Sequence, residues 1–298
     1  MGNAGDVATV ATLQYISPLM TFGGIMDRKP GQLKSFLQLR GYYRRQNLFW
    51  SWYEPRNFGD WIGPYLFERY TGTRPLYCSR RTQAKTQCLY TAGSILRHLR
   101  HNDCATIWGS GIISKADTFA RPRKVLAVRG PLTRERFRSL GYNCPAVYGD
   151  PAVLLPKFNL APPRIPGKIG VIPHFVEYTD YIAWRSNRAT IIDVCKPVDA
   201  VVSEIASCEI TYSSSLHGLI VSHAFGVPSI WMEATRNLDG DGTKFWDYIA
   251  SCRANATQRK SLLASDFART DDALAFLPDQ SALQRGLLDN LPSGWTAP

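Results

Sequence analysis

The sequence alternates short apolar runs with amphipathic segments, and this alternation is the strongest constraint on its fold. Apolar runs at 105–112 and 124–131 each end in a glycine-containing turn, and the second leads into a helical pattern that stops at Gly141. The same order resumes after residue 168. Strands that alternate with helices pair in parallel, because each helix carries the chain back to the same end of the sheet. The sequence therefore predicts an α/β protein.

A proline-rich polar stretch at 157–168 separates the two series of strands and is typical of a linker. We therefore predict two doubly wound, Rossmann-like domains, residues 41–160 and 161–298, that face a cleft. Residues 1–40 are expected to form an N-terminal arm. The apolar stretch at 7–26 contains proline, glycine and several hydroxyl residues, which makes it a poor candidate for a membrane span.

The composition narrows the classes of partner. The chain carries 35 Lys and Arg against 24 Asp and Glu, a net charge of +11 spread along the sequence. Zinc-finger spacing and RNP-like aromatic motifs are missing, so we predict no nucleic-acid partner and favour small anionic substrates or an anionic membrane surface. The seven cysteines are odd in number and contain no CxxC pair, which argues against a disulfide framework or a zinc site. A reducing, cytoplasmic location is expected.

Candidate site residues of the first half lie at predicted strand ends, where open α/β sheets bind ligands. They occur in "NFGD", "WGSG" and "VRGP" and comprise Asn57, Gly59, Asp60, Gly109, Ser110 and Arg129. Asp60 is placed either to cap the following helix or to accept a substrate proton. Gly109 and Ser110 form either a plain tight turn or a ligand-binding loop. Arg129 is either a surface residue or a bidentate ligand for a carboxylate or phosphate.

The stretch "SSSLHGLIVSHAFG" supplies the main candidate of the second half. Ser213, Ser214 and Ser215 precede an apolar helix that each of them is placed to cap, and the N–H groups of its first turn offer positive charge to an anion. His217 lies in that first turn, where a leucine would pack better, and an imidazole there can exchange a proton near neutral pH. His223 is interpreted as structural.

Other groups of the second half have two interpretations. His174 follows a buried strand and either binds a ligand or is a hydrogen-bonded histidine at a domain edge. Lys244 and Tyr248 either reach the cleft or lie on the helix surface.

Four stretches, taken in order, resemble the polysaccharide pyruvyl transferase family. They are "NFGD", "WGSG", "VRGPLT…LGY…VYGDPAVLLP" and "SCEITYSSSLHGLIVSHAFGVPSIW", and the likeness spans residues from about 45 to 250. The resemblance implies a fold similar to the GT-B glycosyltransferases. It also implies phosphoenolpyruvate as pyruvyl donor, a sugar diol as acceptor, a cyclic pyruvate ketal as product and release of phosphate. No metal or other cofactor is needed.

The resemblance implies that the donor is held by Arg129 and by the segment of Ser215, Leu216 and His217. We predict proton transfer by His217 as acid and Asp60 as base. Further candidates are Ser214 and Lys244 for donor binding, and Asn57, Gly59, Gly109, Ser110 and His174 for acceptor binding. Many relatives carry arginine where this chain has Ser215. The missing positive charge would have to come from Arg129, Lys244 or a group such as Arg236.

Three functions stay open from the sequence. The first hypothesis places pyruvyl transfer on a lipid-linked repeat unit at the inner face of the cytoplasmic membrane, where the basic surface meets anionic lipid. The alternative is a GT-B nucleotide-sugar glycosyltransferase, for which Glu233 is placed to hold a ribose. A third is a non-enzymatic basic module that binds nucleic acid or membrane.

Overall fold

The computed structural model of the 298-residue chain describes residues 47–49, 57–79, 87–186, 189–260 and 272–296. The chain divides into two compact units, Met1–Arg40 and Gly41–Pro298, and every described residue belongs to the second. The predicted arm at 1–40 and the apolar stretch at 7–26 therefore lie outside the described residues.

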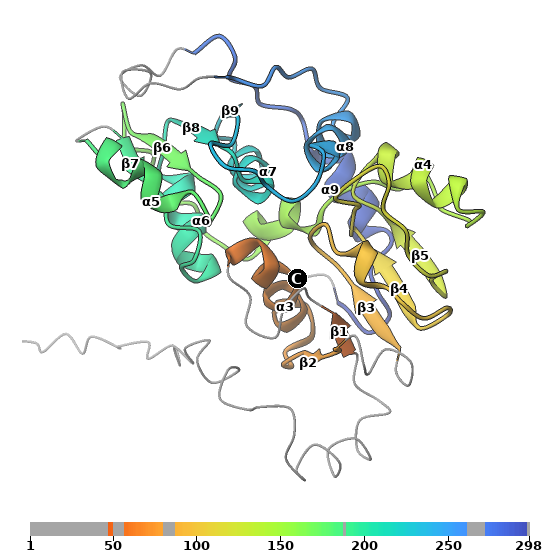
Figure 1. Cartoon of the computed structure of the whole chain (residues 1–298). Coiled ribbons are helices and arrows are strands. Elements are labelled where there is room, and N and C mark those ends of the chain that lie inside the picture. Colours follow the sequence, from red (N-terminus) through yellow and green to blue (C-terminus); the bar gives the residue numbers. More distant parts are fainter. Residues whose placement is uncertain (1–46, 50–56, 80–86, 187–188, 261–271, 297–298) are drawn as a thin grey trace, which may run out of the picture. The chain divides into compact units, whose positions relative to one another are not determined.

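The first half builds a five-stranded parallel sheet with the order β2-β1-β3-β4-β5 (Figure 1). Its strands are β1 (Asn47–Phe49), β2 (Leu76–Tyr77), β3 (Cys88–Tyr90), β4 (Ala105–Trp108) and β5 (Lys124–Ala127). Asn47 pairs with Leu76 on one side and with Cys88 on the other. The direction of progression thus reverses between β1 and β3, and open α/β sheets bind ligands at the carboxyl ends of strands where the order reverses in this way.

The second half builds a four-stranded parallel sheet with the order β7-β6-β8-β9 (Figure 1). Its strands are β6 (Ile169–Ile172), β7 (Ala189–Ile191), β8 (Ile210–Ser213) and β9 (Ser229–Trp231). Every residue of β6 and β8 is buried, as expected for parallel strands in the middle of a covered sheet. Here the order reverses between β6 and β8. These two strands therefore hold the same position in their sheet as β1 and β3 hold in the first sheet.

The α-helices of the described residues include elements that the sequence predicted and others that it did not. They are α3 (Phe58–Thr71), α4 (Pro131–Ser139), α5 (Tyr178–Tyr181), α6 (Val198–Ala206), α7 (Leu216–Ala224), α8 (Thr243–Ser251) and α9 (Ser281–Leu288). Short 3-10 turns are η2 (Leu96–His98), η3 (Pro151–Lys157) and η4 (Ile182–Trp184). The α3 helix stops at Gly72, whose φ of 63° is a left-handed conformation that glycine adopts without strain.

The parallel α/β prediction is confirmed, and local details differ from it. The segment after β3 forms only the 3-10 turn η2, where a helix was expected. Contacts also cross the predicted linker, because α8 packs against α4 and α9 packs against η3. The ring of Trp295 lies 4.9 Å from that of Trp108, an edge-on contact between the C-terminal segment and the first sheet.

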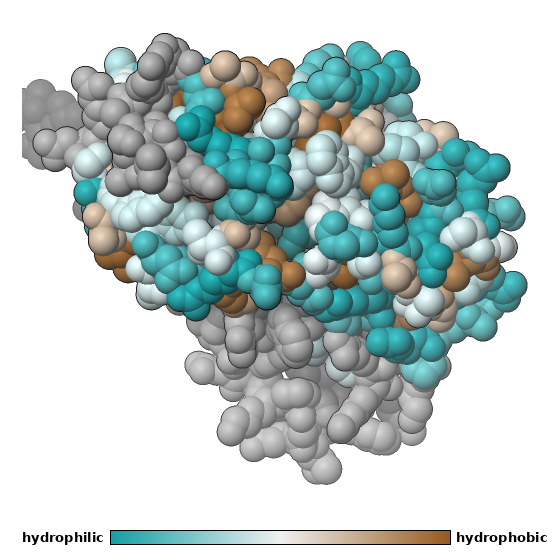
Figure 2. Space-filling view, turned by 45° about the horizontal axis from the view of Figure 1, so that its top comes forward, coloured by the Kyte–Doolittle hydropathy of each residue, from teal (hydrophilic) through white to brown (hydrophobic). Residues whose placement is uncertain are grey.

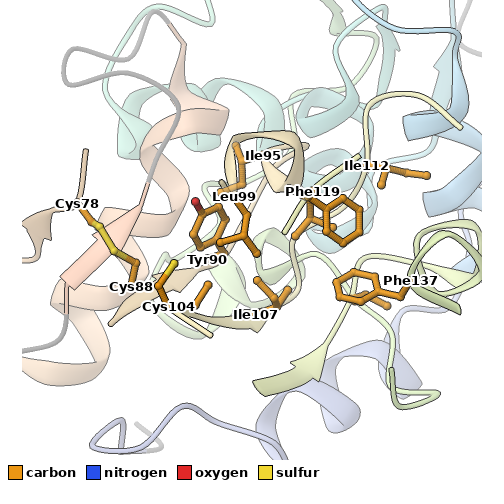
Figure 3. Close-up of a cluster of buried hydrophobic side chains, with 13 residues drawn as sticks. Cys78, Cys88, Tyr90, Ile95, Leu99, Cys104, Ile107, Ile112, Phe119 and Phe137 are labelled. Carbon is orange, nitrogen blue, oxygen red and sulfur yellow. A yellow bond between two sulfur atoms is a disulfide. The ribbon is translucent and has the colours of Figure 1, made fainter. Parts of the chain in front are cut away.

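A hydrophobic core lies on the first sheet and includes a disulfide (Figure 3). Tyr90, Ile107 and Phe137 are fully buried there. Cys78 and Cys88 are joined, with their Cα atoms 6.3 Å apart. The interpretation of the cysteines as free of disulfides is therefore wrong for this pair, because the strands β2 and β3 both flank β1 and bring the two residues together. The cytoplasmic location stays a prediction without that support.

The surface mixes polar and apolar residues. On the face drawn in Figure 2, hydrophilic residues (teal) cover much of the described part, and hydrophobic residues (brown) lie among them. Exposed large hydrophobic side chains include Leu160 and Trp246. Within the described residues, no helix combines the length and the apolar character that crossing a bilayer requires.

Candidate active site

The first turn of α7 begins without a side-chain cap. Ser215 is the N-cap residue, with φ −96° and ψ 128°, and its hydroxyl makes no capping hydrogen bond. The Ser213 hydroxyl instead accepts the Ser215 N–H at 3.1 Å. The expectation that the serines cap this helix is therefore wrong in detail. The N-terminus of α7 keeps the partial positive charge that favours a bound anion.

His217 lies in this first turn and contacts elements of the first half. Its imidazole packs so closely on Gly59 of α3 that a Cβ at that position would come within 2.2 Å of Nδ1. Its Nε2 lies 3.5 Å from Oδ2 of Asp150, within ion-pair range but longer than a normal hydrogen bond. The side chain is 12% exposed. His217 thus joins the second sheet to both α3 and η3.

Asp150 is the site residue that the sequence analysis missed. It is fully buried at the N-cap of η3 and accepts N–H bonds from Gly93 at 3.2 Å and Ala152 at 3.0 Å. Burial raises the pKa of its carboxyl, but the adjacent His217, the backbone N–H bond and the charge of Arg129 outweigh burial and hold that pKa below its ordinary value. The available signal was an acidic residue in "VYGDP", within one of the stretches that resemble the family.

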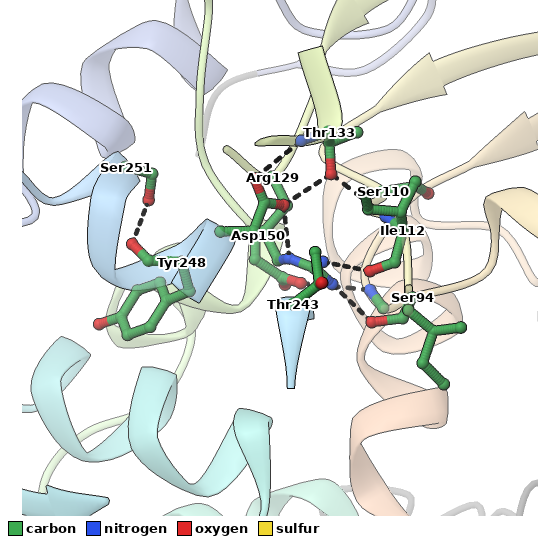
Figure 4. A network of polar contacts seen from close by, with 12 residues as sticks. Ser94, Ser110, Ile112, Arg129, Thr133, Asp150, Thr243, Tyr248 and Ser251 are labelled. Atoms are coloured by element: carbon green, nitrogen blue, oxygen red, sulfur yellow. Dashed lines mark hydrogen bonds and ion pairs between the residues drawn. The ribbon is translucent and has the colours of Figure 1, made fainter. Parts of the chain in front are cut away.

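Arg129 is fully buried, which excludes its interpretation as a surface residue (Figure 4). Its Nε donates to Asp247 of α8 at 3.1 Å, one terminal nitrogen donates to the Ser94 hydroxyl at 2.6 Å, and the other donates to the Ile112 carbonyl. Its role as a donor ligand stays a prediction. Ser94 immediately follows Gly93, the residue that donates to Asp150, so Arg129 and Asp150 contact adjacent residues of this turn.

Asn57, rather than Asp60, is the N-cap of α3. The Asn57 side chain accepts the Asp60 N–H at 3.2 Å and donates to the Asp60 carboxylate at 3.0 Å. The capping interpretation of Asp60 is therefore corrected, because Asp60 sits one turn inside the helix. Gly59 lies between the two and leaves space for the imidazole of His217.

Gly109 and Ser110 form a tight turn. Gly109 has a φ of 91°, and a Cβ there would collide with the ring of Pro151. The Ser110 side chain is fully buried and its hydroxyl donates to the Thr91 carbonyl. The plain-turn interpretation thus describes the geometry of this pair, and their predicted contact with an acceptor stays untested.

Ser214 and His174 are held together by a second residue that the sequence analysis missed, Glu177. The buried Glu177 carboxylate accepts the Ser214 hydroxyl at 2.6 Å, and that hydroxyl accepts the His174 N–H at 2.9 Å. The same carboxylate accepts the N–H groups of Thr235 and Arg236. It therefore ties together the turns that follow β6, β8 and β9.

The surroundings of His174 keep its imidazole neutral, and those of Arg236 hold its guanidinium in an ion pair. Burial and then the charge of Lys244 lower the pKa of His174 to about 4, so its imidazole is neutral at physiological pH. Its Nδ1 is buried without a hydrogen-bond partner among the described residues. The Arg236 guanidinium pairs with Asp180 at 2.6 and 2.8 Å, which makes it a poor replacement for the family arginine.

Lys244 interacts electrostatically with Arg129 and Asp60, and its role in donor binding stays a prediction. Burial and then repulsion from Arg129 lower its pKa to about 8, against attraction from Asp239 and Asp60. Tyr248, one turn along α8, points away into the core, where its hydroxyl lies 2.7 Å from Nδ1 of His223. The structural interpretation of His223 agrees with this packing. Within the described part of the chain, no group of three His, Cys, Asp or Glu side chains is placed to hold a metal ion.

Comparison with known proteins supports the family resemblance that the motifs indicate. An uncharacterized protein of Acanthamoeba polyphaga mimivirus is 25% identical over 206 residues, which cover 65% of this chain and 70% of that protein. A crystal structure of a functionally uncharacterized protein from Klebsiella pneumoniae subsp. pneumoniae covers 74% of this chain and 94% of its own, at 15% identity and a TM-score of 0.42. The resemblance read from the motifs is confirmed, since residues 99–234 match the family model of the polysaccharide pyruvyl transferases.

Proposed function

We propose that this protein transfers a pyruvyl group from phosphoenolpyruvate to two hydroxyls of one sugar in a polysaccharide repeat unit. The family match over residues 99–234 supports a transferase that acts in polysaccharide biosynthesis. The observation that carries the finer proposal is the position of His217, in the uncapped first turn of α7 and against Gly59 and Asp150. An acid at an anion-binding helix terminus suits a donor that must be both bound and protonated.

The donor is a carboxylate and a phosphate on a three-carbon enol, so its site must offer several positive groups. The N–H groups at the start of α7 are one, and the ammonium of Lys244 is another. The buried guanidinium of Arg129, which donates to Ser94, adds a positive charge that also acts on Asp150. In this arrangement Lys244 replaces the arginine that many relatives carry at the position of Ser215.

The chemistry begins with addition of a sugar hydroxyl to the donor double bond. The hydroxyl oxygen bonds to C2, its proton passes to Asp60, and His217 gives a proton to the methylene carbon, which becomes a methyl group. A second hydroxyl of the same sugar then displaces phosphate from C2 and closes the ketal. Its proton restores the imidazolium of His217, and the proton held by Asp60 leaves with the phosphate. Asp60 is suited to the first transfer because it follows Gly59, the residue that packs on the imidazole.

We also propose a class of acceptor and a place in the cell for the reaction. The net charge of +11 is consistent with work beside anionic lipid, so a lipid-linked acceptor at the cytoplasmic membrane face is the acceptor we propose. His174 and Asn57 are the residues proposed to contact it.

A direct assay tests the proposal. Purified protein with phosphoenolpyruvate and a lipid-linked sugar diol is expected to release phosphate in proportion to ketal formed, as measured by phosphate detection and mass spectrometry. Calorimetry with phosphoenolpyruvate and with nucleotide sugars separates this function from a glycosyltransferase. Binding of a nucleotide sugar without binding of phosphoenolpyruvate contradicts the proposal.

Donor affinity is expected to fall as the pH rises through about 8, the pKa of Lys244. Only the protonated amine pairs with the anionic donor, and burial makes the ammonium lose its proton within the working range. Calorimetric titration with phosphoenolpyruvate between about pH 7 and about pH 9 measures this change.

The Lys244→Arg variant is the matched control, because a guanidinium stays charged across this range. Its donor affinity is expected to be independent of pH. A wild-type affinity that is equally flat would show that Lys244 does not contact the donor.

A further inference from the structure

The buried carboxylate beside His217 has no role in the chemistry described so far. Resting on the proposed function, we propose that Asp150 is the positioning residue of His217, which orients its imidazole and keeps it in the protonated form that an acid requires. Asp150 itself stays out of reach of substrate, because its side chain is fully buried.

The carboxylate is rigidly placed before it meets the imidazole. Its Oδ1 accepts the Ala152 N–H at 3.0 Å, which caps η3, and its Oδ2 accepts the Gly93 N–H at 3.2 Å. The helix α7 packs directly on η3. Two elements of the first half therefore fix the carboxylate, and α7 brings the imidazole to it.

The two ring nitrogens of His217 have different surroundings. Nε2 is buried, with Oδ2 of Asp150 at 3.5 Å and no hydrogen-bond partner among the described residues. Nδ1 faces Gly59. An Nε2–H held toward the carboxylate leaves Nδ1 as the nitrogen that gives its proton to the donor. Pairs of this kind are often long in the free enzyme and shorten when substrate binds.

Among the described charged side chains, Asp150 is the one that the structure places within ion-pair range of the imidazole. The imidazole Nε2 lies 3.5 Å from Oδ2 of Asp150, and the positive charge of Arg129 acts on the same carboxylate. On α3 the nearest acidic group is Asp60, and on α8 the nearest basic group is Lys244, which interacts with Asp60. A buried anion in contact with an imidazole favours the imidazolium.

The Asp150→Asn variant tests this role because it removes the charge and keeps the cap. Its amide oxygen can still accept the Ala152 N–H, while the amide meets Nε2 without a negative charge. We expect kcat for phosphate release to fall roughly 10²-fold, with KM for phosphoenolpyruvate unchanged. We also expect the alkaline limb of the pH–rate profile to move to lower pH, because the imidazolium is lost earlier.

The control is Asp117→Asn, at an aspartate that also accepts a backbone N–H, that of Ile113 at 2.8 Å, outside the site. It is expected to keep the wild-type profile. If Asp150→Asn does not fold, Asp150→Glu retains the charge and is expected to keep the wild-type pH limb at a lower kcat. An unchanged pH limb in Asp150→Asn, or a loss confined to KM, overturns the proposal.

A measurement without substrate separates this inference from the proposed function. The imidazole of His217, assigned by comparison with a His217→Gln variant, is titrated by NMR in wild type and in Asp150→Asn. Deprotonation at lower pH in the variant supports the positioning role even if phosphoenolpyruvate is not the donor. Identical titrations refute it even if phosphate is released.

Discussion

Replacing His217 with asparagine is expected to lower kcat for phosphate release from phosphoenolpyruvate by about 10²–10⁴-fold, the usual contribution of a single proton transfer. Asparagine is similar in size and polarity, so it keeps the first turn of α7 intact, but it has no proton to give to the methylene carbon. In the proposed site the donor is also held by the helix N-terminus and Lys244, so its affinity should change little. Steady-state kinetics and calorimetry measure the two quantities.

The matched control is His101→Asn, the same substitution at an exposed histidine. It is expected to retain wild-type kcat, which excludes a general effect of removing an imidazole. Near-normal turnover in His217→Asn would show that another group protonates the donor, and it would remove the main support for the proposed mechanism.

The Asp247→Ala variant is expected to lose about 3–5 kcal/mol of unfolding free energy, because it leaves the buried guanidinium of Arg129 without its counter-charge. The carboxylate also accepts the Thr133 N–H at 2.9 Å and the Thr133 hydroxyl at 2.6 Å, so its loss uncaps α4 as well. Both side chains of the ion pair are 0% exposed, and water cannot replace the missing partner. Equilibrium urea denaturation followed by circular dichroism measures the change.

Asp239→Ala provides the comparison, since Asp239 also pairs with an arginine, Arg97, but is largely exposed. Solvent screens such a pair, and its loss is expected to cost no more than about 1 kcal/mol. Equal losses in the two variants would mean that the buried pair stabilises the protein no more than a surface pair does.

Local rules predicted much of the fold. Helices α3, α4 and α7 are followed by Gly72, Gly141 and Gly226, each with a positive φ, as glycines after helical patterns suggest. The strands β4 to β9 also coincide with apolar runs. The short strand β2 and the helix α9 were missed, because the pairing of β2 with β1 and the packing of α9 on η3 are contacts distant in sequence.

The site was predicted less completely, because it also depends on contacts between residues distant in sequence. His217 and Gly59 come together as the strand-end rule suggests. The burial of Arg129 depends on Asp247, 118 residues further along the chain, and no local pattern reveals that partner. Asp150 and Glu177 are likewise ordinary acidic residues in the sequence. Their importance arises from contacts with Gly93 and Ser214 that only the folded chain creates.

The cap that Asp247 places on α4 has a consequence for how the polypeptide matures during translation. Thr133 leaves the ribosome 114 residues before the carboxylate that completes its helix, and Arg129 precedes its counter-ion by 118 residues. The amino-terminal sheet therefore emerges before the carboxylate that pairs with its buried cation. Final consolidation of that sheet is postponed until nearly the whole chain has been synthesised, so truncated products that stop before α8 should be recognised by quality control as incompletely folded.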